Sequence, residues 1–289
     1  MRMLLGWVLG VVLLAGDAGA ETLRIASWNI AHLVADEGRG CVRRDAAGFQ
    51  RVRDVIAVID ADVWLLQEIE GEAALAQVFD PQDWVFHVSG RPPSDSFPEC
   101  RGNPGQDLAM QATAIVVRNG VDHVRLEDVR ALDVAREGRM RWGTAIRLSG
   151  GATPVDVMNV HLQSRCWDGF GQFACTTLFA QMPKVRQWIE ARTAEGTPAI
   201  VGGDFNRRLE EPNDIFWRLL NADGNLHVAG AGVTPGCFER FTEFIDFFVL
   251  EDAAMALKVP GSFVETTFTG PADLFPSDHC PIHIELRLP

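Results

Sequence analysis

The sequence predicts an α/β sandwich, with β-sheets inside and helices outside, and three observations support this fold. Short apolar runs of strand length alternate with longer segments whose apolar residues recur at helical spacing. The runs at 114–118, 144–148 and 155–160 follow one another with only turns or short irregular stretches between them, as antiparallel strands do. Other runs are separated by helical segments, as in crossover connections. Mixed sheets covered by helices explain all three observations.

The first 20 residues are set apart from this fold, because they have the parts of a secretory signal. Arg2 gives a positive start, residues 4–14 are an apolar run, and Ala18-Gly19-Ala20 is a small-residue cleavage site. The apolar run is shorter than the roughly 20 residues that span a bilayer. We therefore expect residues 1–20 to be a cleaved signal peptide and residues 21–289 to be a single domain without a transmembrane segment. The expected location is secreted or periplasmic.

The first elements of the domain alternate between the two periodicities. Residues 22–27 alternate apolar and polar side chains and predict a strand, and residues 45–60 place apolar side chains on one helical face. The continuous apolar run at 63–66 predicts a buried strand. A helix at 72–79 and a short strand at 84–88 are expected next, with a turn between them at a proline.

A long loop separates these elements from the three consecutive strands. Residues 89–107 are rich in Pro, Gly, Ser and charge, and we expect Cys100 to tether this loop. Long loops that persist in compact domains tend to be functional.

The last part of the chain returns to alternating helices and strands. Residues 177–194 have apolar residues at helical spacing, and residues 198–201 are a strand that leads to Gly202-Gly203-Asp204. A helix at 213–220 and a strand at 244–250 follow. The alternation from residue 282 to the end predicts the last strand.

The charge of the chain limits its function. The formal net charge of −13 at pH 7 gives an acidic surface that repels polyphosphates at long range, which disfavours a general basic nucleic-acid binder. Phosphate chemistry would then require bound cations or local groups of arginines. Eight arginines either form such groups or are scattered solvated charges. They are Arg39, Arg43, Arg44, Arg136, Arg139, Arg141, Arg207 and Arg208.

Six cysteines in an exported chain predict disulfides before metal ligands. Cys166 and Cys175 are the pair that closeness favours. The sequence gives no connectivity for the other four, and joining Cys41 to Cys100 and Cys237 to Cys280 is one arrangement among the alternatives. No close-set CxxC pair supports a zinc site.

Polar residues recur where the strand-like runs end. Ligand sites in layered α/β folds assemble at strand ends, so one shared site explains this recurrence more simply than separate structural roles. Each residue alone also has a structural interpretation, such as a turn-forming asparagine or a buried, hydrogen-bonded histidine. The candidates are Asn29, Glu68, His161, Asp204 with Asn206, Asp246, and Asp278 with His279.

The chemistry of this set favours a hard cation. It is rich in oxygen ligands and poor in thiolates and clustered imidazoles, which favours Mg²⁺, Mn²⁺ or Ca²⁺ over zinc. Mg²⁺ needs only one or two protein carboxylates, and Glu68 and Asp278 meet that requirement. His279 could take a proton from water while Asp246 orients its imidazole. The sequence therefore predicts metal-assisted attack of water on phosphorus.

Six motifs in order resemble those of the endonuclease/exonuclease/phosphatase superfamily, typified by DNase I, from about Thr22 to the C-terminus. They are Ser27-Trp28-Asn29, Leu66-Gln67-Glu68, Asn159-Val160-His161-Leu162, Gly203-Asp204-Phe205-Asn206, Ile245-Asp246-Phe247 and Ser277-Asp278-His279-Cys280-Pro281-Ile282. The resemblance implies a four-layered α/β sandwich, in which two packed mixed β-sheets are flanked by helices and the site lies at one edge of the sheets. The stretch at 161–166 is similar to a bacterial exported branch, which implies the pairs Cys166–Cys175 and Cys237–Cys280.

The resemblance also implies a role for each site residue. Asn29, Glu68 and Asp278 would hold a divalent cation, and Asp204 would orient or deprotonate the attacking water or bind a second metal. His161 would stabilise or protonate phosphate oxygens, and His279 with Asp246 would be the acid/base dyad. Asn206 and Arg141, together with Asn159 of the motif around His161, would contact the substrate.

Two departures from the family pattern concern the substrate side of the site. The chain has no tyrosine, whereas many nucleases of the family place one beside the phosphate, and Trp142, Trp167 or Phe170 could replace only its stacking. Secreted DNase relatives have a glutamate that partners the first histidine, and this chain has Gln111 at that position. A neutral amide makes a cationic His161 less favourable.

We expect a monomeric, divalent-metal-dependent phosphodiesterase, most simply a DNase-like endonuclease, with nucleic acid as its substrate and no protein partner. One alternative is a sphingomyelinase-type phospholipase C or a phosphatase on small phosphoesters. A membrane-acting enzyme should present an exposed aromatic hairpin, for which residues 167–173 are the candidate. A second alternative is a non-catalytic binding module, against which the intact motif set argues.

Overall fold

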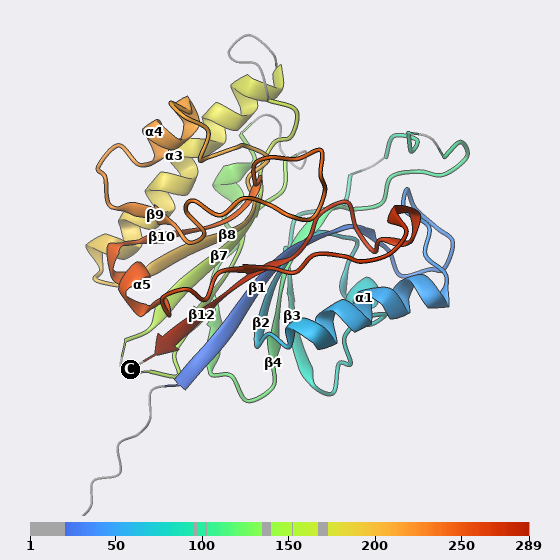
Figure 1. The fold of residues 1–289 in the computed structure, drawn as a ribbon, viewed down its shortest axis with the longest axis horizontal. Helices are drawn as coiled ribbons and strands as arrows, with labels where there is room; N and C mark the ends of the chain where they lie inside the picture. Colours follow the sequence, from blue (N-terminus) through green and yellow to red (C-terminus); the bar gives the residue numbers. More distant parts are fainter. Residues whose placement is uncertain are drawn as a thin grey trace, which may run out of the picture.

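Two mixed β-sheets lie face to face in the middle of the molecule (Figure 1). Among the described residues each sheet has six strands. In spatial order, the first contains β11 (Val264–Glu265), β12 (Ile282–Leu288), β1 (Glu21–Leu33), β2 (Val63–Ile69), β4 (Ala112–Arg118) and β3 (Trp84–Val88). The second contains β5 (His123–Arg125), β6 (Thr144–Leu148), β7 (Val155–His161), β8 (Ala199–Asp204), β10 (Asp246–Glu251) and β9 (Leu226–Val228). β1 pairs with β2 in parallel, as β7 does with β8, and the other pairs are antiparallel.

Helices cover the outer face of each sheet (Figure 1). On β2, Trp64 and Leu66 point outward and pack in one apolar cluster with Phe49 of helix α1 (Ala46–Ile59). The alternate residue Leu65 points inward and belongs to the cluster between the sheets. Helices α3 (Phe173–Ala194) and α4 (Ile215–Leu220) cover the second sheet. The expected four-layered α/β sandwich is therefore confirmed.

The structure describes residues 21–94, 97–101, 103–134, 140–151, 153–166 and 173–288. Several predictions fall elsewhere. The expected signal peptide at 1–20, Arg136, Arg139 and the aromatic residues Trp167 and Phe170 lie outside the described residues.

Most predicted elements are present, with shifted ends. The expected strand at 198–201 continues to Asp204, which places that carboxylate in the sheet itself. The predicted helix at 72–79 is wrong in length, because α2 (Glu72–Leu75) ends after four residues and turns follow. The strand at 244–250 begins two residues later, at Asp246. The short elements β5, β9, β11, α5 (Asp252–Leu257) and the 3₁₀ turns η1 (Arg130–Leu132) and η2 (Ala272–Leu274) were not expected, because they are too short to show a period.

Three disulfides are present among the described residues: two join loops, and one joins a loop to the first turn of α3, which contains Cys175. They link Cys41 to Cys100, Cys166 to Cys175 and Cys237 to Cys280, the arrangement considered from the sequence. The first ties the long loop at 89–107 to the segment after β1, and Asn103 reinforces it by donating its amide to the carbonyl of Cys41 at 2.8 Å. Within the described ranges, no helix combines the length and the apolar character needed to cross a membrane.

Candidate active site

Strand pairing brings the polar strand-end residues together at one edge of the sandwich. In the second sheet, Asp204 at the end of β8 is in register with His161 at the end of β7 and with Asp246 at the start of β10. In the first sheet, Asn29 on β1 is in register with Gln67, the residue before Glu68 on β2. Because β1 also contacts β8 across the sheet interface, the two groups meet.

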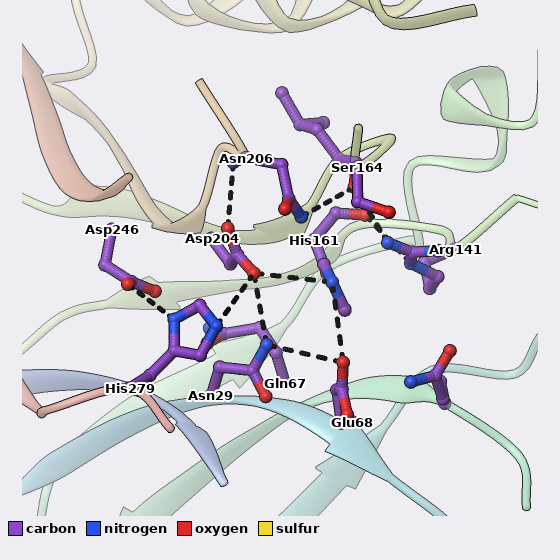
Figure 2. A network of polar contacts seen from close by, with 12 residues as sticks. Asn29, Gln67, Glu68, Arg141, His161, Ser164, Asp204, Asn206, Asp246 and His279 are labelled. Atoms are coloured by element: carbon purple, nitrogen blue, oxygen red, sulfur yellow. Dashed lines mark hydrogen bonds and ion pairs between the residues drawn. The ribbon is translucent and has the colours of Figure 1, made fainter. Parts of the chain in front are cut away.

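Asp204 lies at the centre of this group (Figure 2). Its Oδ2 accepts a hydrogen bond from Asn29 Nδ2 at 3.1 Å and lies 3.4 Å from His161 Nε2 and 4.0 Å from His279 Nε2. Its Oδ1 accepts from the backbone N–H of Asn206 at 2.8 Å. The side chain is about 1% exposed, so these contacts replace water around a buried carboxylate.

His161 stands between two carboxylates. Its Nε2 lies 3.4 Å from Asp204 Oδ2 and 3.9 Å from Glu68 Oε1. Its Nδ1 is buried and has no hydrogen-bond partner within the described part of the chain. A neutral imidazole that carries its proton on Nε2 satisfies both facts, because it donates toward the carboxylates and leaves Nδ1 without a proton.

His279 and Asp246 form a hydrogen-bonded pair (Figure 2). His279 Nδ1 lies 2.7 Å from Asp246 Oδ2, which leaves Nε2 directed toward Asp204. The loop that carries His279 is fixed at several points: Ser277 Oγ donates to the carbonyl of Asn29 at 2.6 Å, and the indole of Trp28 donates to the carbonyl of His279 at 2.8 Å. The disulfide between Cys237 and Cys280 anchors the loop one residue later.

Burial and neighbouring charges shift the pKa values of Asp204, His161 and His279 in different directions. Burial, reinforced by the charge of Asp246, raises the pKa of Asp204 to about 7. Burial, with Arg141 beside it, lowers the pKa of His161 well below its usual value. Burial also opposes the charge on His279, but Asp246 outweighs it and raises the pKa of His279 well above its usual value. At neutral pH the site therefore combines a cationic His279, a neutral His161 and an Asp204 close to its titration point.

The donors at this edge fit a hard divalent cation. Glu68 and Asp204 place carboxylate oxygens on either side of His161, and Asp204, Asp246 and His279 can bring one ligand atom each within 4.8 Å of one another. Asp246 Oδ1 is buried without a hydrogen-bond partner among the described residues. Two carboxylates with water and substrate oxygens suit Mg²⁺, and a cation would offset the burial of Asp204. Asn29 is the less suitable donor as placed, because its Oδ1 accepts from the backbone N–H of Ala31 at 3.1 Å and its amide faces Asp204.

A cavity of about 500 Å³ opens above these groups. Glu68, His161, Asp204 and His279 form part of its floor. The loop held by the disulfide between Cys41 and Cys100 forms a wall, together with the segment after β7. The wall residues are Cys41, Pro98, Glu99, Cys100, Arg101, Leu108, Ser164 and Arg165.

Two of the predicted substrate contacts border this cavity. Arg141 donates to the carbonyl of His161 at 3.2 Å and of Leu162 at 2.8 Å, which holds its guanidinium at the cavity edge. Asn206 donates its side-chain amide to the same carbonyl of Leu162 at 3.2 Å. Both side chains therefore border the space that a phosphate group in the cavity would occupy.

The structure corrects the substrate role expected for Asn159. Its side chain is fully buried below the site, and its amide group donates to the carbonyls of Leu66 and Ala114, both at 2.8 Å. Its Oδ1 accepts from Gln67 Nε2 at 2.7 Å. Since both amide protons and the oxygen are used inside the protein, Asn159 joins the two sheets and does not reach the cavity.

Asp278 stands apart from the other expected cation ligands. It is exposed and is not among the residues that line the cavity, although its charge acts on the buried Arg44. The neighbouring His279 points inward instead.

The predicted arginine groups are mostly engaged elsewhere. Arg39 pairs with Asp36 and Glu70, Arg207 pairs with Asp214, and Arg208 approaches Glu243. Of the eight arginines named from the sequence, Arg141 alone lines the cavity among those that the structure describes. Two others, Arg101 and Arg165, line it without having been expected.

The sequence did not indicate His32, and it indicated Arg44 only as one of the arginines that could form local positive groups. His32 lines the cavity and lies 3.2 Å from Glu68 through its Nε2. Arg44 is buried, and burial lowers its pKa to about 10, so it remains cationic at neutral pH. No periodic pattern in the sequence indicates the role of either residue, because both lie at or contact the irregular end of β1.

A sequence model of the endonuclease/exonuclease/phosphatase family matches residues 26–279 of the chain. No curated protein sequence matches it.

Solved structures with the same fold share little sequence with the chain. Truncated TDP2 from Caenorhabditis elegans is 18% identical with a TM-score of 0.61, and the alignment covers 92% of this chain and 98% of that one. The AP endonuclease LMAP from Leishmania major is 15% identical with a TM-score of 0.63, covering 93% and 88%. The 3′ phosphatase NExo from Neisseria, bound to a product DNA hairpin, is 16% identical with a TM-score of 0.62, covering 91% and 99%. At these identities the likeness shows the fold alone.

Proposed function

Because the chain belongs to the endonuclease/exonuclease/phosphatase family, whose members are phosphoester hydrolases, we propose that it is a divalent-metal-dependent phosphodiesterase. The observation that carries this proposal is the buried Asp204, which lies within 4.0 Å of both His161 and His279 at the floor of an accessible cavity. Three titratable groups whose environments separate their pKa values are typical of a site for proton transfer.

We assign to Asp204 the role of base that takes a proton from the attacking water. A carboxylate whose pKa is raised to about 7 can take a proton from water near neutral pH, where a carboxylate at its usual pKa is a weaker base. The backbone N–H of Asn206 and the amide of Asn29 hold its two oxygens in fixed directions.

We assign to His279 the stabilisation of the negative charge that develops on the phosphate and on the leaving oxygen. Asp246 keeps the imidazole cationic and fixes its ring, so Nε2–H faces the reaction centre. His161, neutral and protonated on Nε2, and the guanidinium of Arg141 would contact the phosphate from the other side.

Glu68 is the first residue that would hold Mg²⁺, with Mn²⁺ or Ca²⁺ as substitutes. Asp204 would be a ligand only in place of its role as a base, because a bound cation lowers the pKa of a carboxylate, and Asn29 and Asp278 stay secondary candidates. When bound, the cation would neutralise phosphate oxygens and act as a Lewis acid.

Nucleic acid is the substrate class that we propose. Two of the structural relatives are an AP endonuclease and a 3′ phosphatase bound to a product DNA hairpin. The cavity has local positive charge, although the chain as a whole is acidic, because it is lined by Arg101, Arg141 and Arg165. The three disulfides suit an oxidising compartment, which supports the proposed export through the segment at 1–20.

Small phosphoesters are the second candidate substrates. The net charge of −13 disfavours long polyanions, and a cavity of about 500 Å³ is large enough for a small phosphoester.

A panel of four substrates with Mg²⁺ tests these proposals: supercoiled plasmid, bis(p-nitrophenyl) phosphate, p-nitrophenyl phosphate and sphingomyelin vesicles. We expect cleavage of the plasmid and of bis(p-nitrophenyl) phosphate, and none in EDTA. Turnover of the monoester alone would identify a phosphatase, and release of phosphocholine without plasmid nicking would identify a phospholipase. Failure on all four would support a binding module.

A further inference from the structure

The end of β1 has an unusual backbone beside the site. The register between β1 and β2 shifts between Asn29 and Leu33, and both residues at the centre of this irregularity have left-handed φ angles, 54° for Ala31 and 55° for His32. Residues other than glycine avoid this region because Cβ crowds the backbone. Consecutive strained residues next to a catalytic group are worth examining for function.

Arg44 holds this irregular segment in place. The buried guanidinium donates to the carbonyls of Ile30 at 2.5 Å, Ala31 at 2.9 Å and His32 at 3.1 Å. It also donates to the carbonyl of Pro276 at 2.8 Å, at the start of the loop that carries His279. One cation thus fixes the strand end against the catalytic loop, and the chain turns His32 toward the cavity.

Two atoms of His32 contact the same carboxylate oxygen of Glu68. Its backbone N–H donates to Glu68 Oε2 at 3.1 Å, and its ring Nε2 lies 3.2 Å from the same oxygen. The other oxygen, Oε1, faces the centre of the site, 3.5 Å from Asn29 Nδ2 and 3.9 Å from His161 Nε2. The two oxygens of the carboxylate therefore have different surroundings.

Gln111 determines how the ring of His32 can bond. Its side-chain nitrogen Nε2 lies 3.3 Å from His32 Nδ1. An amide nitrogen only donates, so Nδ1 accepts and the proton of the neutral imidazole is on Nε2, pointing at Glu68. Gln111 is the residue that we expected beside His161, and the structure places it on His32 instead.

We propose that His32, oriented by Gln111, is a positioning residue that holds Oε2 of Glu68 and leaves Oε1 alone to face a divalent cation. This assignment rests on the proposed function in one respect, since it takes Glu68 as a cation ligand. Partners that orient a metal ligand in this way usually affect metal affinity strongly. A merely structural His32 would support the fold of the strand end and leave cation affinity unchanged.

Binding of Mn²⁺ alone, measured by isothermal titration and by the electron paramagnetic resonance signal of free Mn²⁺, tests the proposal without any substrate. In His32→Gly the backbone N–H to Glu68 remains and glycine adopts the left-handed φ freely, so the fold keeps or gains thermal stability. The ring is lost, and with it the donor to Glu68 and the acceptor for Gln111. We expect the affinity for Mn²⁺ to fall by about ten-fold or more.

The matched control is Ala31→Gly, which changes the neighbouring left-handed residue and removes no polar group. It should bind Mn²⁺ within about two-fold of the wild type, well short of the loss expected when an outer partner of a ligand is removed. Gln111→Leu removes the partner of Nδ1 and should show a smaller loss than His32→Gly.

Equal Mn²⁺ affinity in His32→Gly and the wild type would overturn the proposal, and so would an equal loss in His32→Gly and Ala31→Gly, because the backbone would then be responsible. A wild type that binds no Mn²⁺ is a different result. It would contradict the proposed metal dependence itself, and this assignment with it.

Discussion

The change Asp246→Asn tests the charge arrangement of the site, because it keeps the shape of the side chain and removes its charge. In the wild type, Asp246 Oδ2 lies 2.7 Å from His279 Nδ1 and raises the pKa of the imidazole against the effect of burial. A hydrogen bond to a charged group contributes about 1.5–3 kcal/mol. Because each pKa unit corresponds to about 1.36 kcal/mol, the substitution should lower the pKa of His279 by about one to two pH units.

The measurable result is the pH dependence of kcat/KM on bis(p-nitrophenyl) phosphate at saturating Mg²⁺. If the reaction needs cationic His279, the rate falls as the pH rises through the pKa of that group, and Asp246→Asn moves this alkaline limb to lower pH by about one to two units. Asp246 also contributes to the raised pKa of Asp204, so the acid limb moves in the same direction.

The surface offers a matched control for this experiment. His227 Nε2 lies 2.7 Å from Asp252 Oδ1, the same type of pair at the same distance, with the carboxylate about 68% exposed. Asp252→Asn should leave both limbs in place. An alkaline limb that stays in place or moves to higher pH in Asp246→Asn would refute the role given to His279.

Three further predictions concern stability, each measured by urea unfolding. Asn159→Leu removes the amide that donates to two buried main-chain carbonyls and the oxygen that accepts from Gln67, and it should cost about 2–5 kcal/mol, so a loss below about 1 kcal/mol would contradict the inter-sheet role. Burial, with His123 adjacent, lowers the pKa of His87 to about 4, so the unfolded chain binds its proton first and stability falls as the pH decreases from about 6.5 toward 4. His87→Gln should reduce that fall by about 1–2 kcal/mol, allowing for partial solvent screening, and an unchanged pH profile would reject this cause. Replacing both Cys41 and Cys100 by alanine removes a crosslink over 59 residues and should cost about 2–5 kcal/mol, and unchanged stability would show that the loop is held by other contacts.

The motif order and the strand-end positions were enough to predict most of the residues that the structure brings together, because the register of the strands determines which strand ends are neighbours. Asp204 and His161 are far apart in the sequence, but each ends a strand of a parallel pair, so their side chains meet at one sheet edge. The sequence also marked the loop of His279 and its disulfide partner.

Two of the candidate residues lie away from the cavity, each for a local reason. Asn159 is two residues before His161 on the same strand and points to the same side, but it lies roughly 6–7 Å deeper in the sandwich. Asp278 and His279 are neighbours in the chain, yet one is exposed and the other lines the cavity. Sequence pattern does not resolve such differences within a loop or along a strand that is buried on both faces.

His32 could not be found from the sequence for a different reason. Its position depends on two left-handed residues, and neither alanine nor histidine indicates that conformation as glycine would. Arg44 holds the segment through three of its carbonyls and joins it to the carbonyl of Pro276, and these contacts have no sequence signature.

The rate of plasmid cleavage by the wild type and by His279→Ala, each with Mg²⁺ and with EDTA, tests the central claim most directly. We expect the wild type to cleave the plasmid, EDTA to abolish this cleavage, and His279→Ala to reduce its rate by about 10²–10⁴-fold, the usual contribution of a positioned acid or base. Equal rates for the two proteins, or cleavage that persists in EDTA, would contradict it.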